Sequence, residues 1–374
     1  MVVRDRSSVE NAPADTLLIE GVDIASLFVP GEDLPACAQL LEVAWRRRQA
    51  ALLALELMVA RERPGEWKLS GFKDAMEIYK RLQPSVRRRL VEHPPFRVWL
   101  KLATNLLAGP VKPDPVRGAE VENRLAQFKC LISDVLEQPR PQPFLVQRYS
   151  VDPLIAEVAP PSYIFKEFEP KHALESSRPY TLAFFREVAE AALRRIETVW
   201  PAFATLFSQF VKIVVHLPEA EFRSCSAHRF AGVVMLSAQD DSLFAVEESL
   251  IHEWAHQVLY CLMELDPLVE HDGEKMFTLP WSGAERDFYG YFHAAYVYWV
   301  LAVYMARAIG REPNEDIAIR ARLLTILSGL DKGIADLGTV SAFTPAGRLF
   351  FDRLAACATR ALSSDEPWLI GFSD

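Results

Sequence analysis

The chain has 374 residues, 50% of them hydrophobic and 24% charged, and its net charge is −9. This length allows one large domain or two ordinary ones with real cores, and the composition excludes a disordered chain and a membrane protein. The acidic balance argues against nucleic acid as the main partner, because binding phosphates needs clustered positive charge. Two runs of three arginines, at 46–48 and 87–89, are expected to be solvated helix faces; a docking patch for an acidic peptide is the alternative.

The first twenty residues contain Arg4, Asp5, Arg6 and Glu10 and no apolar core segment, so no signal peptide is expected. Nowhere does the sequence reach about 18 uncharged apolar residues, the length that a membrane span needs. The cysteines number five and are widely spaced, which fits reduced thiols better than a disulfide framework. These features predict a cytoplasmic protein without a membrane partner.

The first 140 residues are expected to form a helical region of unknown role. The stretch 34–63 is rich in Ala, Leu, Glu and Arg and predicts one long helix. Further helices are expected at 72–93, 97–107 and 116–136. Prolines require an extended segment at 137–144, so a domain boundary is expected near 138–162. This region could bind a leader peptide or a second subunit, as in a homo-oligomer.

The remainder, 141–374, is expected to be the catalytic domain. A helix is predicted at 180–200, and short β-branched strands at 211–216 and 230–237. The next helix, 242–263, follows the capping residues Asp240, Asp241 and Ser242 and ends before Pro267. Helices at 283–309, 315–330 and 345–362 complete the domain. The predicted fold class is mainly α with a small β-sheet (α+β), in which helices form a metal-binding core.

The motif His252-Glu253-Trp254-Ala255-His256 lies in the helix predicted at 242–263. Residues four apart share a helix face, so His252 and His256 direct two imidazoles toward one point. Imidazole binds zinc, iron, copper and nickel. Glu253 lies about 100° around the helix and can flank the ion without binding it. The alternative is a pair of core histidines that hydrogen-bond to backbone carbonyls.

Two histidines need a third ligand, and His293 is the preferred candidate. His293 is the titratable group within an otherwise apolar stretch, which is expected to be buried. A buried imidazole needs a partner. A lone histidine in such a stretch is otherwise a core residue. Glu285 is the natural choice for a zinc peptidase that takes a carboxylate from the next helix. The candidates considered downstream of the motif are Glu264, Glu270, His271, Glu274, Glu285 and His293.

Arg286 precedes His293 by seven residues, so in a helix at 283–309 both side chains would face the same way. A guanidinium there could hold the far carboxylate of a dicarboxylate whose near end chelates the metal. A surface ion pair with Asp287 or Glu285, which would contribute little, is the alternative.

The segments Gly232–Ser237, His252–His256 and Pro280-Trp281, with Arg286, Gly290 and the run 293–296, resemble the HEXXH-motif proteins of ribosomal peptide modification. The resemblance covers about 210–310. It implies an iron(II)- and 2-oxoglutarate-dependent oxygenase that hydroxylates a β-carbon in a precursor peptide. The metal ligands carry over as His252, His256 and His293, and Arg286 carries over as the oxoglutarate anchor. Where the family continues Arg-x-Asp-Pro-Arg-Pro after Pro-Trp, this chain has 282–287, Ser-Gly-Ala-Glu-Arg-Asp.

Three functions follow from the motif. In an oxygenase, three protein ligands leave positions for oxoglutarate and oxygen, and Glu253 orients a ligand or a water. In a zinc metallopeptidase, Glu253 is the general base. A binding protein that recognises a peptide without catalysis is the third. For the oxygenase, a dry pocket is expected from the aromatic residues near the site, with Trp281 next to the cosubstrate; these are Trp254, Trp281, Phe288 and Tyr289.

Overall fold

The structure is a computed structural model that describes residues 18–19, 21–28, 35–108, 115–137, 145–148, 152–159, 181–217, 223–237, 242–270, 276–311 and 315–363. The chain divides into two compact units. The central unit is Leu41–Cys261, and the terminal unit consists of Met1–Leu40 and Leu262–Asp374. One hydrophobic core in the central unit contains residues on both sides of the boundary expected near 138–162. The predicted fold class is confirmed, because the described chain is mainly helical with small sheets.

Helices dominate the first part of the described chain, and most of them begin with proline. Proline fits the first helical position because that position needs no backbone N–H donor. The helices are α1 (Pro35–Glu62), α2 (Pro64–Leu69), α3 (Phe72–Arg81), α4 (Pro84–Glu92), α5 (Pro94–Ala108), α6 (Pro115–Glu137) and α7 (Pro153–Val158). The long helix predicted at 34–63 is therefore confirmed as α1, and those at 97–107 and 116–136 as α5 and α6.

The single helix expected at 72–93 is wrong, since the structure has α3 and α4 there. Leu82 and Gln83 are extended, with ψ near 147° at both residues. Pro84 explains the extended Gln83, because the ring of a proline disfavours helical backbone in the residue before it. The segment expected to be extended at 137–144 lies outside the described residues after Glu137.

A four-stranded sheet lies in the central unit in the order β3 (Leu145–Arg148), β4 (Ile213–His216), β6 (Val233–Leu236) and β5 (Ser224–Cys225). The first three strands are parallel, and β5 pairs antiparallel with β6 at one edge. The strands predicted at 211–216 and 230–237 are confirmed as β4 and β6. Both are buried along their whole length, as strands covered on both faces are.

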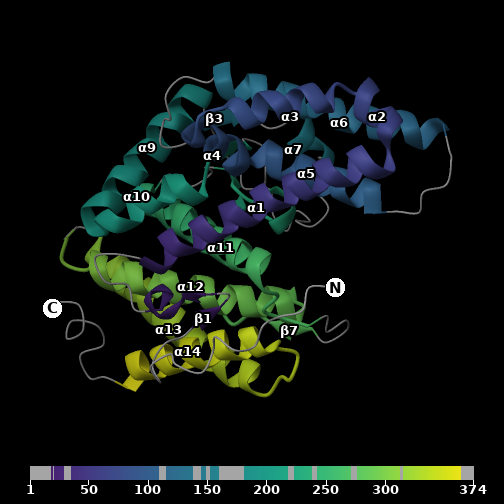
Figure 1. The fold of residues 1–374 in the computed structure, drawn as a ribbon. Helices are drawn as coiled ribbons and strands as arrows, with labels where there is room; N and C mark the ends of the chain where they lie inside the picture. Colours follow the sequence, from purple (N-terminus) through teal and green to yellow (C-terminus); the bar gives the residue numbers. More distant parts are fainter. Residues whose placement is uncertain are drawn as a thin grey trace. The chain divides into compact units, whose positions relative to one another are not determined.

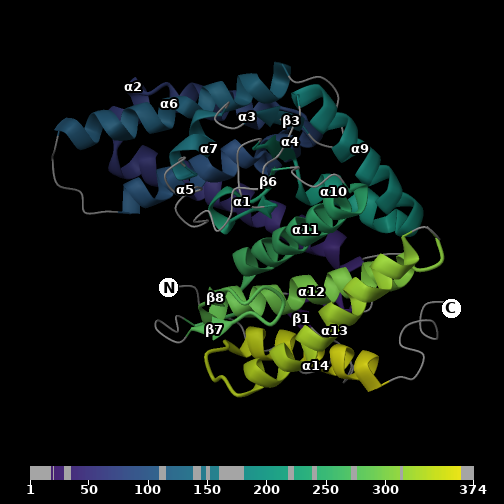
Figure 2. The same ribbon diagram turned by 180° about the vertical axis from the view of Figure 1, so that it is seen from behind.

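Helices cover the two faces of this sheet. Alternate residues of β4 and β6, including Ile213 and Met235, belong to the hydrophobic core formed with α3–α7. On the other face, His216 of β4 stacks on Phe185 of α9 (Leu182–Val199), with ring centroids 4.4 Å apart. Helices α10 (Pro201–Phe210) and α11 (Leu243–Leu265) lie on this side, away from α3–α7, in both ribbon views (Figures 1 and 2).

The terminal unit contains α12 (Phe288–Ala308), α13 (Asp316–Gly338) and α14 (Pro345–Ser363), with short hairpins β1 (Leu18–Ile19)–β2 (Val22–Asp23) and β7 (Phe277–Thr278)–β8 (Glu285–Arg286). The helix predicted at 283–309 begins later than expected. Asp287 ends the extended segment and caps α12, accepting a hydrogen bond from the Gly290 N–H at 2.8 Å.

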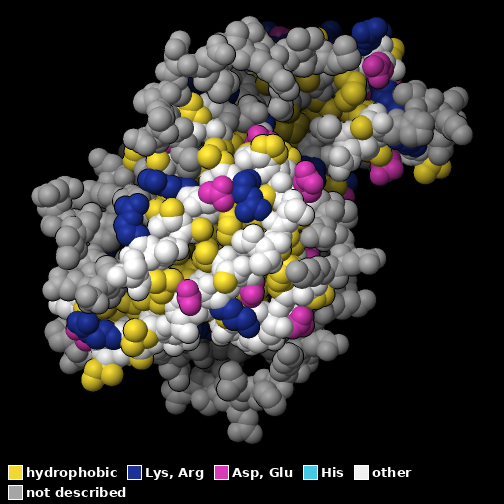
Figure 3. Space-filling model, turned by 90° about the horizontal axis from the view of Figure 1, so that it is seen from below, with side chains coloured by type: hydrophobic (Ala, Val, Ile, Leu, Met, Phe, Trp, Pro, Cys, Tyr) yellow, Lys and Arg dark blue, Asp and Glu magenta, His cyan; other side chains and the backbone are white. Residues whose placement is uncertain are grey.

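None of the helices in the described segments is long and apolar enough to cross a membrane. In the space-filling view of Figure 3, basic and acidic side chains alternate with apolar ones over the coloured surface. Charges of one sign form no large patch among the described atoms of that face.

Candidate metal centre

Helix α11 presents two neighbouring rows of side chains, each with a spacing of four residues. One row consists of His252, His256 and Tyr260, and the other of Glu253, Gln257 and Cys261. Because a step of four residues advances about 40° beyond a full turn, the members of each row lie almost above one another. We call them the histidine row and the glutamate row.

The histidine row brings two imidazoles together, as the sequence predicts. The ring centroids of His252 and His256 are 5.0 Å apart, with an interplanar angle of 67°. Both residues are intermediate between buried and exposed. Burial of the His256 ring lowers its pKa to about 4, so this imidazole is neutral at neutral pH, the form that binds a metal.

The glutamate row docks α11 on the sheet. The Ser226 hydroxyl, just after β5, donates to the Glu253 carboxylate at 2.6 Å. Gln257 accepts from the Gly232 N–H at 2.6 Å and donates to the Val233 carbonyl at 3.3 Å, at the start of β6. These three hydrogen bonds fix the rotation of α11, and with it the direction of the histidine row.

Glu253 is 2% exposed. Burial raises the pKa of its carboxyl to about 7, although hydrogen bonds from Ser226 and Ser224 lower it. A carboxyl group with such a pKa can hold or release a proton near neutral pH, directly beside the histidine pair. This property suits either a group that orients a ligand or a group that takes a proton from water.

Tyr260 and His228 extend the cluster beyond the motif. The Tyr260 ring stacks on His256 with centroids 5.9 Å apart, and its hydroxyl donates to the Ser226 carbonyl at 3.2 Å. The exposed His228 lies edge-on to Tyr260, also at 5.9 Å. The four-residue spacing from His256 could have identified Tyr260. Ser226 and His228 have no sequence signal, because β5 approaches α11 only through the fold.

His293 lies in α12 of the terminal unit and is 2% exposed. Its Nε2 lies 3.3 Å from the Met263 sulfur, and the Tyr289 ring lies 4.2 Å away between centroids. Met263, like His293, belongs to the terminal unit. Among the described residues, no three His, Cys, Asp or Glu side chains form a metal-holding group.

Arg286 does not share a helix with His293, so the expectation that both face the same way along one helix is wrong. Arg286 lies in β8, ahead of the Asp287 cap, and is exposed. Its guanidinium donates to the Glu285 carbonyl at 2.9 Å. Glu285 is exposed as well and accepts a hydrogen bond from the Thr278 hydroxyl.

The remaining candidate ligands lie in different parts of the chain. Glu264 belongs to α11, and Glu270 is an exposed residue after it. His271 and Glu274 lie outside the described residues.

Of the four aromatic residues expected to form a dry pocket, Tyr289 lies beside a candidate ligand, His293. Trp254 packs on Phe203 of α10 with ring centroids 4.6 Å apart. Trp281 stacks on Tyr298 at 4.1 Å and donates to the Ile326 carbonyl at 3.0 Å. Phe288 packs on Phe343 at 4.8 Å. These contacts give Trp254, Trp281 and Phe288 a packing role.

A search against protein-family models finds no match to this chain, and no curated protein matches it.

Proposed function

We propose that this protein is a metal-dependent enzyme whose ion is held by His252 and His256. The observation that carries this proposal is the pair of imidazoles with ring centroids 5.0 Å apart on one face of α11. Two imidazoles on one face are a donor set for a first-row transition metal. Three hydrogen bonds from the glutamate row hold that face in place, which is the outer support that metal sites need.

We propose further that the ion is iron(II), that His293 is its third ligand, and that the reaction is a 2-oxoglutarate-dependent hydroxylation of a β-carbon in a ribosomal precursor peptide. Iron(II) with oxoglutarate would supply the oxidising chemistry. Glu253 supports this assignment because its carboxylate is engaged by Ser226, in the row that docks on the sheet. In this reaction Glu253 positions α11 and its histidines, and Arg286 binds a carboxylate of the cosubstrate.

A zinc metallopeptidase is the second candidate, and one observation favours it. The central unit by itself contains His252, His256 and a buried carboxyl group next to them, Glu253. In a peptidase, Glu253 would accept the proton of a metal-bound water. It would therefore be indispensable for activity, whereas a positioning role tolerates an amide of the same shape.

The first test measures the metal. Protein purified without oxygen and loaded with iron(II) is expected to retain about one ion per chain, and His252→Ala and His256→Ala to lose it. His93→Gln, a histidine substitution between α4 and α5 and outside the histidine row, is the control and should retain iron. If all three variants bind iron as the unmodified protein does, the metal centre is wrong.

The second test distinguishes the two reactions with Glu253→Gln. For the oxygenase, this variant should still release succinate from oxoglutarate, at a reduced rate. For the peptidase, it should abolish peptide cleavage by the zinc-loaded protein. Absence of succinate with any peptide, together with zinc-dependent cleavage, would overturn the oxygenase in favour of the peptidase.

A further inference from the structure

Tyr260, the last member of the histidine row, is held on several sides within the central unit. Its ring is nearly parallel to the His256 ring, with an interplanar angle of 14° and centroids 5.9 Å apart. Its hydroxyl donates to the Ser226 carbonyl at 3.2 Å, and the His228 ring meets it edge-on at 62°. Because Tyr260 is also 5% exposed, its ring has little freedom to turn.

Ser226 connects Tyr260 to the sheet as well as to the motif. Its carbonyl accepts from the Tyr260 hydroxyl, and its own hydroxyl donates to the Glu253 carboxylate at 2.6 Å. A chain of contacts thus runs from Glu253 through Ser226 and Tyr260 to the His256 ring. The position of the Tyr260 ring therefore depends on the residue after β5 and not on α11 alone.

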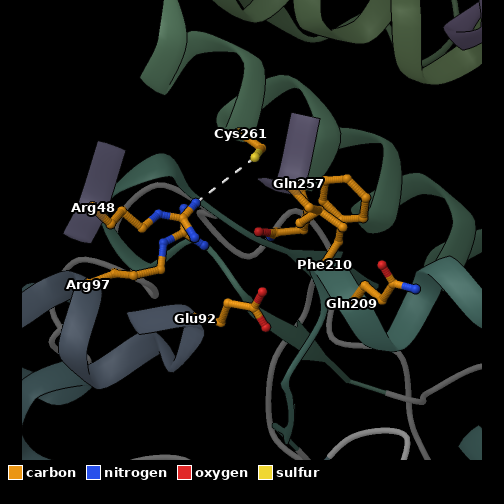
Figure 4. Close-up of a pocket in the computed structure, with 8 residues that line it drawn as sticks. Arg48, Glu92, Arg97, Gln209, Phe210, Gln257 and Cys261 are labelled. Carbon is orange, nitrogen blue, oxygen red and sulfur yellow. Dashed lines mark hydrogen bonds between the residues drawn. The ribbon is translucent and has the colours of Figure 1, made fainter. Parts of the chain in front are cut away.

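The neighbouring glutamate row faces the interior of the central unit. Gln257 and Cys261 line a small pocket there, together with Arg48 of α1 (Figure 4). Arg48 donates to the Cys261 sulfur at 3.9 Å and is half-buried, so the solvated face expected for its arginine run is wrong at this residue. Since these contacts prevent α11 from turning, the direction of the His256 imidazole depends on rotations of its own side chain.

The plane of an imidazole determines where a metal ion can bind to it. The lone pair of the ligating nitrogen lies in the ring plane, so the ion lies in or near that plane. The planes of His252 and His256 meet at 67°, and an ion held by both rings lies where the two planes intersect. Rotation of the His256 ring about its Cβ–Cγ bond would displace this position.

We propose that Tyr260 is a positioning residue of the metal centre, whose ring keeps the His256 imidazole in the plane that binds the ion. A parallel neighbour opposes rotation of the imidazole, because the turned ring would press its edge into the tyrosine face. Partners that orient a metal ligand in this way preserve metal affinity. The inference rests on the proposed function, since it assigns Tyr260 to an ion that His252 and His256 hold.

The test is titration of the metal-free protein with cobalt(II), whose visible absorption reports the geometry of its ligands. Tyr260→Leu removes the stacked ring. It should weaken cobalt binding about tenfold, the lower end of the range for residues that orient a ligand, and should change the absorption bands. Tyr260→Phe keeps the ring, so its affinity and bands should resemble those of the unmodified protein more than those of Tyr260→Leu.

Tyr79→Leu is the matched control. It removes another buried tyrosine of the central unit, 1% exposed and in the core formed with α3–α7, without touching the histidine row. This variant should lose stability in urea unfolding and keep the cobalt affinity and bands. If Tyr260→Leu does not fold, Tyr260→Met replaces it, because the flexible methionine side chain fills the space without a flat ring.

His252→Ala separates the two proposals. If it binds cobalt as the unmodified protein does, or if the unmodified protein binds none, the metal centre itself is wrong and Tyr260 has no such role. If His252→Ala loses cobalt while the Tyr260 variant without a ring keeps the affinity and the bands, only the role of Tyr260 is overturned. An equal change in Tyr79→Leu would likewise reduce that role to general stability.

Discussion

At the scale of single residues, the contacts of Glu253 explain more than its place in the motif. The sequence indicates only that this side chain flanks the histidine pair. The structure adds that the Ser226 hydroxyl donates to its carboxylate at 2.6 Å and that Tyr260 donates to the Ser226 carbonyl. Ser226 therefore links β5 to both rows of α11.

Substituting Ser226 by alanine tests this link. A buried carboxyl group that loses a donor costs about 1–3 kcal/mol of stability, and the pKa of Glu253 should rise further, because the Ser226 hydrogen bond lowers it. Urea unfolding is the measurement. Ser208→Ala is the control, since the Ser208 hydroxyl only donates to the Thr205 carbonyl within α10. Equal stability of the two variants would contradict the link.

His93 gives the central unit a pH dependence. Burial, together with the charges of Arg89 and Lys212, lowers the pKa of this histidine to about 4. In the unfolded chain its pKa is about 6.5. Between these values the unfolded chain binds a proton that the folded chain does not, so the free energy of unfolding falls as the pH falls from about 6.5 to about 4.

The full effect at pH 4 and below is about 3 kcal/mol, at about 1.4 kcal/mol for each pH unit of difference. Urea unfolding of the unmodified protein and of His93→Gln at several pH values isolates this contribution. The glutamine cannot titrate, so the variant should lose less stability between pH 6.5 and pH 4. Parallel curves for the two proteins would show that His93 titrates normally in the fold.

At the scale of elements, helix periodicity and caps predicted most of the helices, and the errors have local causes. Pro84 separates α3 from α4, and the Asp287 cap starts α12 after Arg286. Helix α10 was missed, although Pro201 marks its start. The short strand β3 has a parallel partner in β4, 68 positions further along the chain by register, Leu145 to Ile213, and a pairing across such a distance leaves no local pattern.

The residues of the candidate site also differ in whether the sequence could predict their positions. His252 and His256 could be predicted to converge, because one helix determines their spacing. Ser226 could not, because only tertiary packing brings β5 to α11. The contacts of Trp281 with Tyr298 and with the Ile326 carbonyl could not be predicted either, because they join segments that are distant in sequence.

Two glycines of α13 test how tightly Trp281 packs. A Cβ at Gly329 would lie within van der Waals overlap of the Trp281 indole, which Tyr298 and the Ile326 carbonyl hold in place. Gly329→Ala should therefore destabilise the protein by about 1–3 kcal/mol through overpacking. A Cβ at Gly338, in the same helix, meets no atom within 4 Å.

Gly338→Ala should leave the stability unchanged or raise it by up to about 1 kcal/mol, because alanine favours helix over glycine. Thermal unfolding of the two variants gives the comparison, and near-ultraviolet circular dichroism reports on the Trp281 environment. Trp281 would be loosely held if Gly329→Ala proved as stable as Gly338→Ala.

At the scale of the whole molecule, the division into two units does not follow the order of the chain. The terminal unit takes residues from both ends, and the chain passes from one unit to the other within α1 and within α11. The helix that carries the histidine row thus ends in the terminal unit, which also contains His293. Sequence patterns describe elements in order and could not have predicted a unit assembled from both ends.

Charge at this scale predicts no affinity for nucleic acid. The net charge is −9, and the arginine runs are engaged within the central unit: Arg46 and Arg88 pair with Glu42, and Arg89 donates to the Val135 carbonyl.

A protein that binds DNA through phosphates loses affinity steeply as the salt concentration rises. Fluorescence anisotropy with a labelled duplex in low salt should therefore stay flat up to about 10 µM protein, within the range of ordinary non-specific binding. The double variant Glu42→Gln/Glu92→Gln removes the carboxylates that neutralise Arg88. Its anisotropy shows whether the released charge of Arg88 is enough for DNA binding. A salt-dependent rise with the unmodified protein would mean that the basic residues form a functional surface after all.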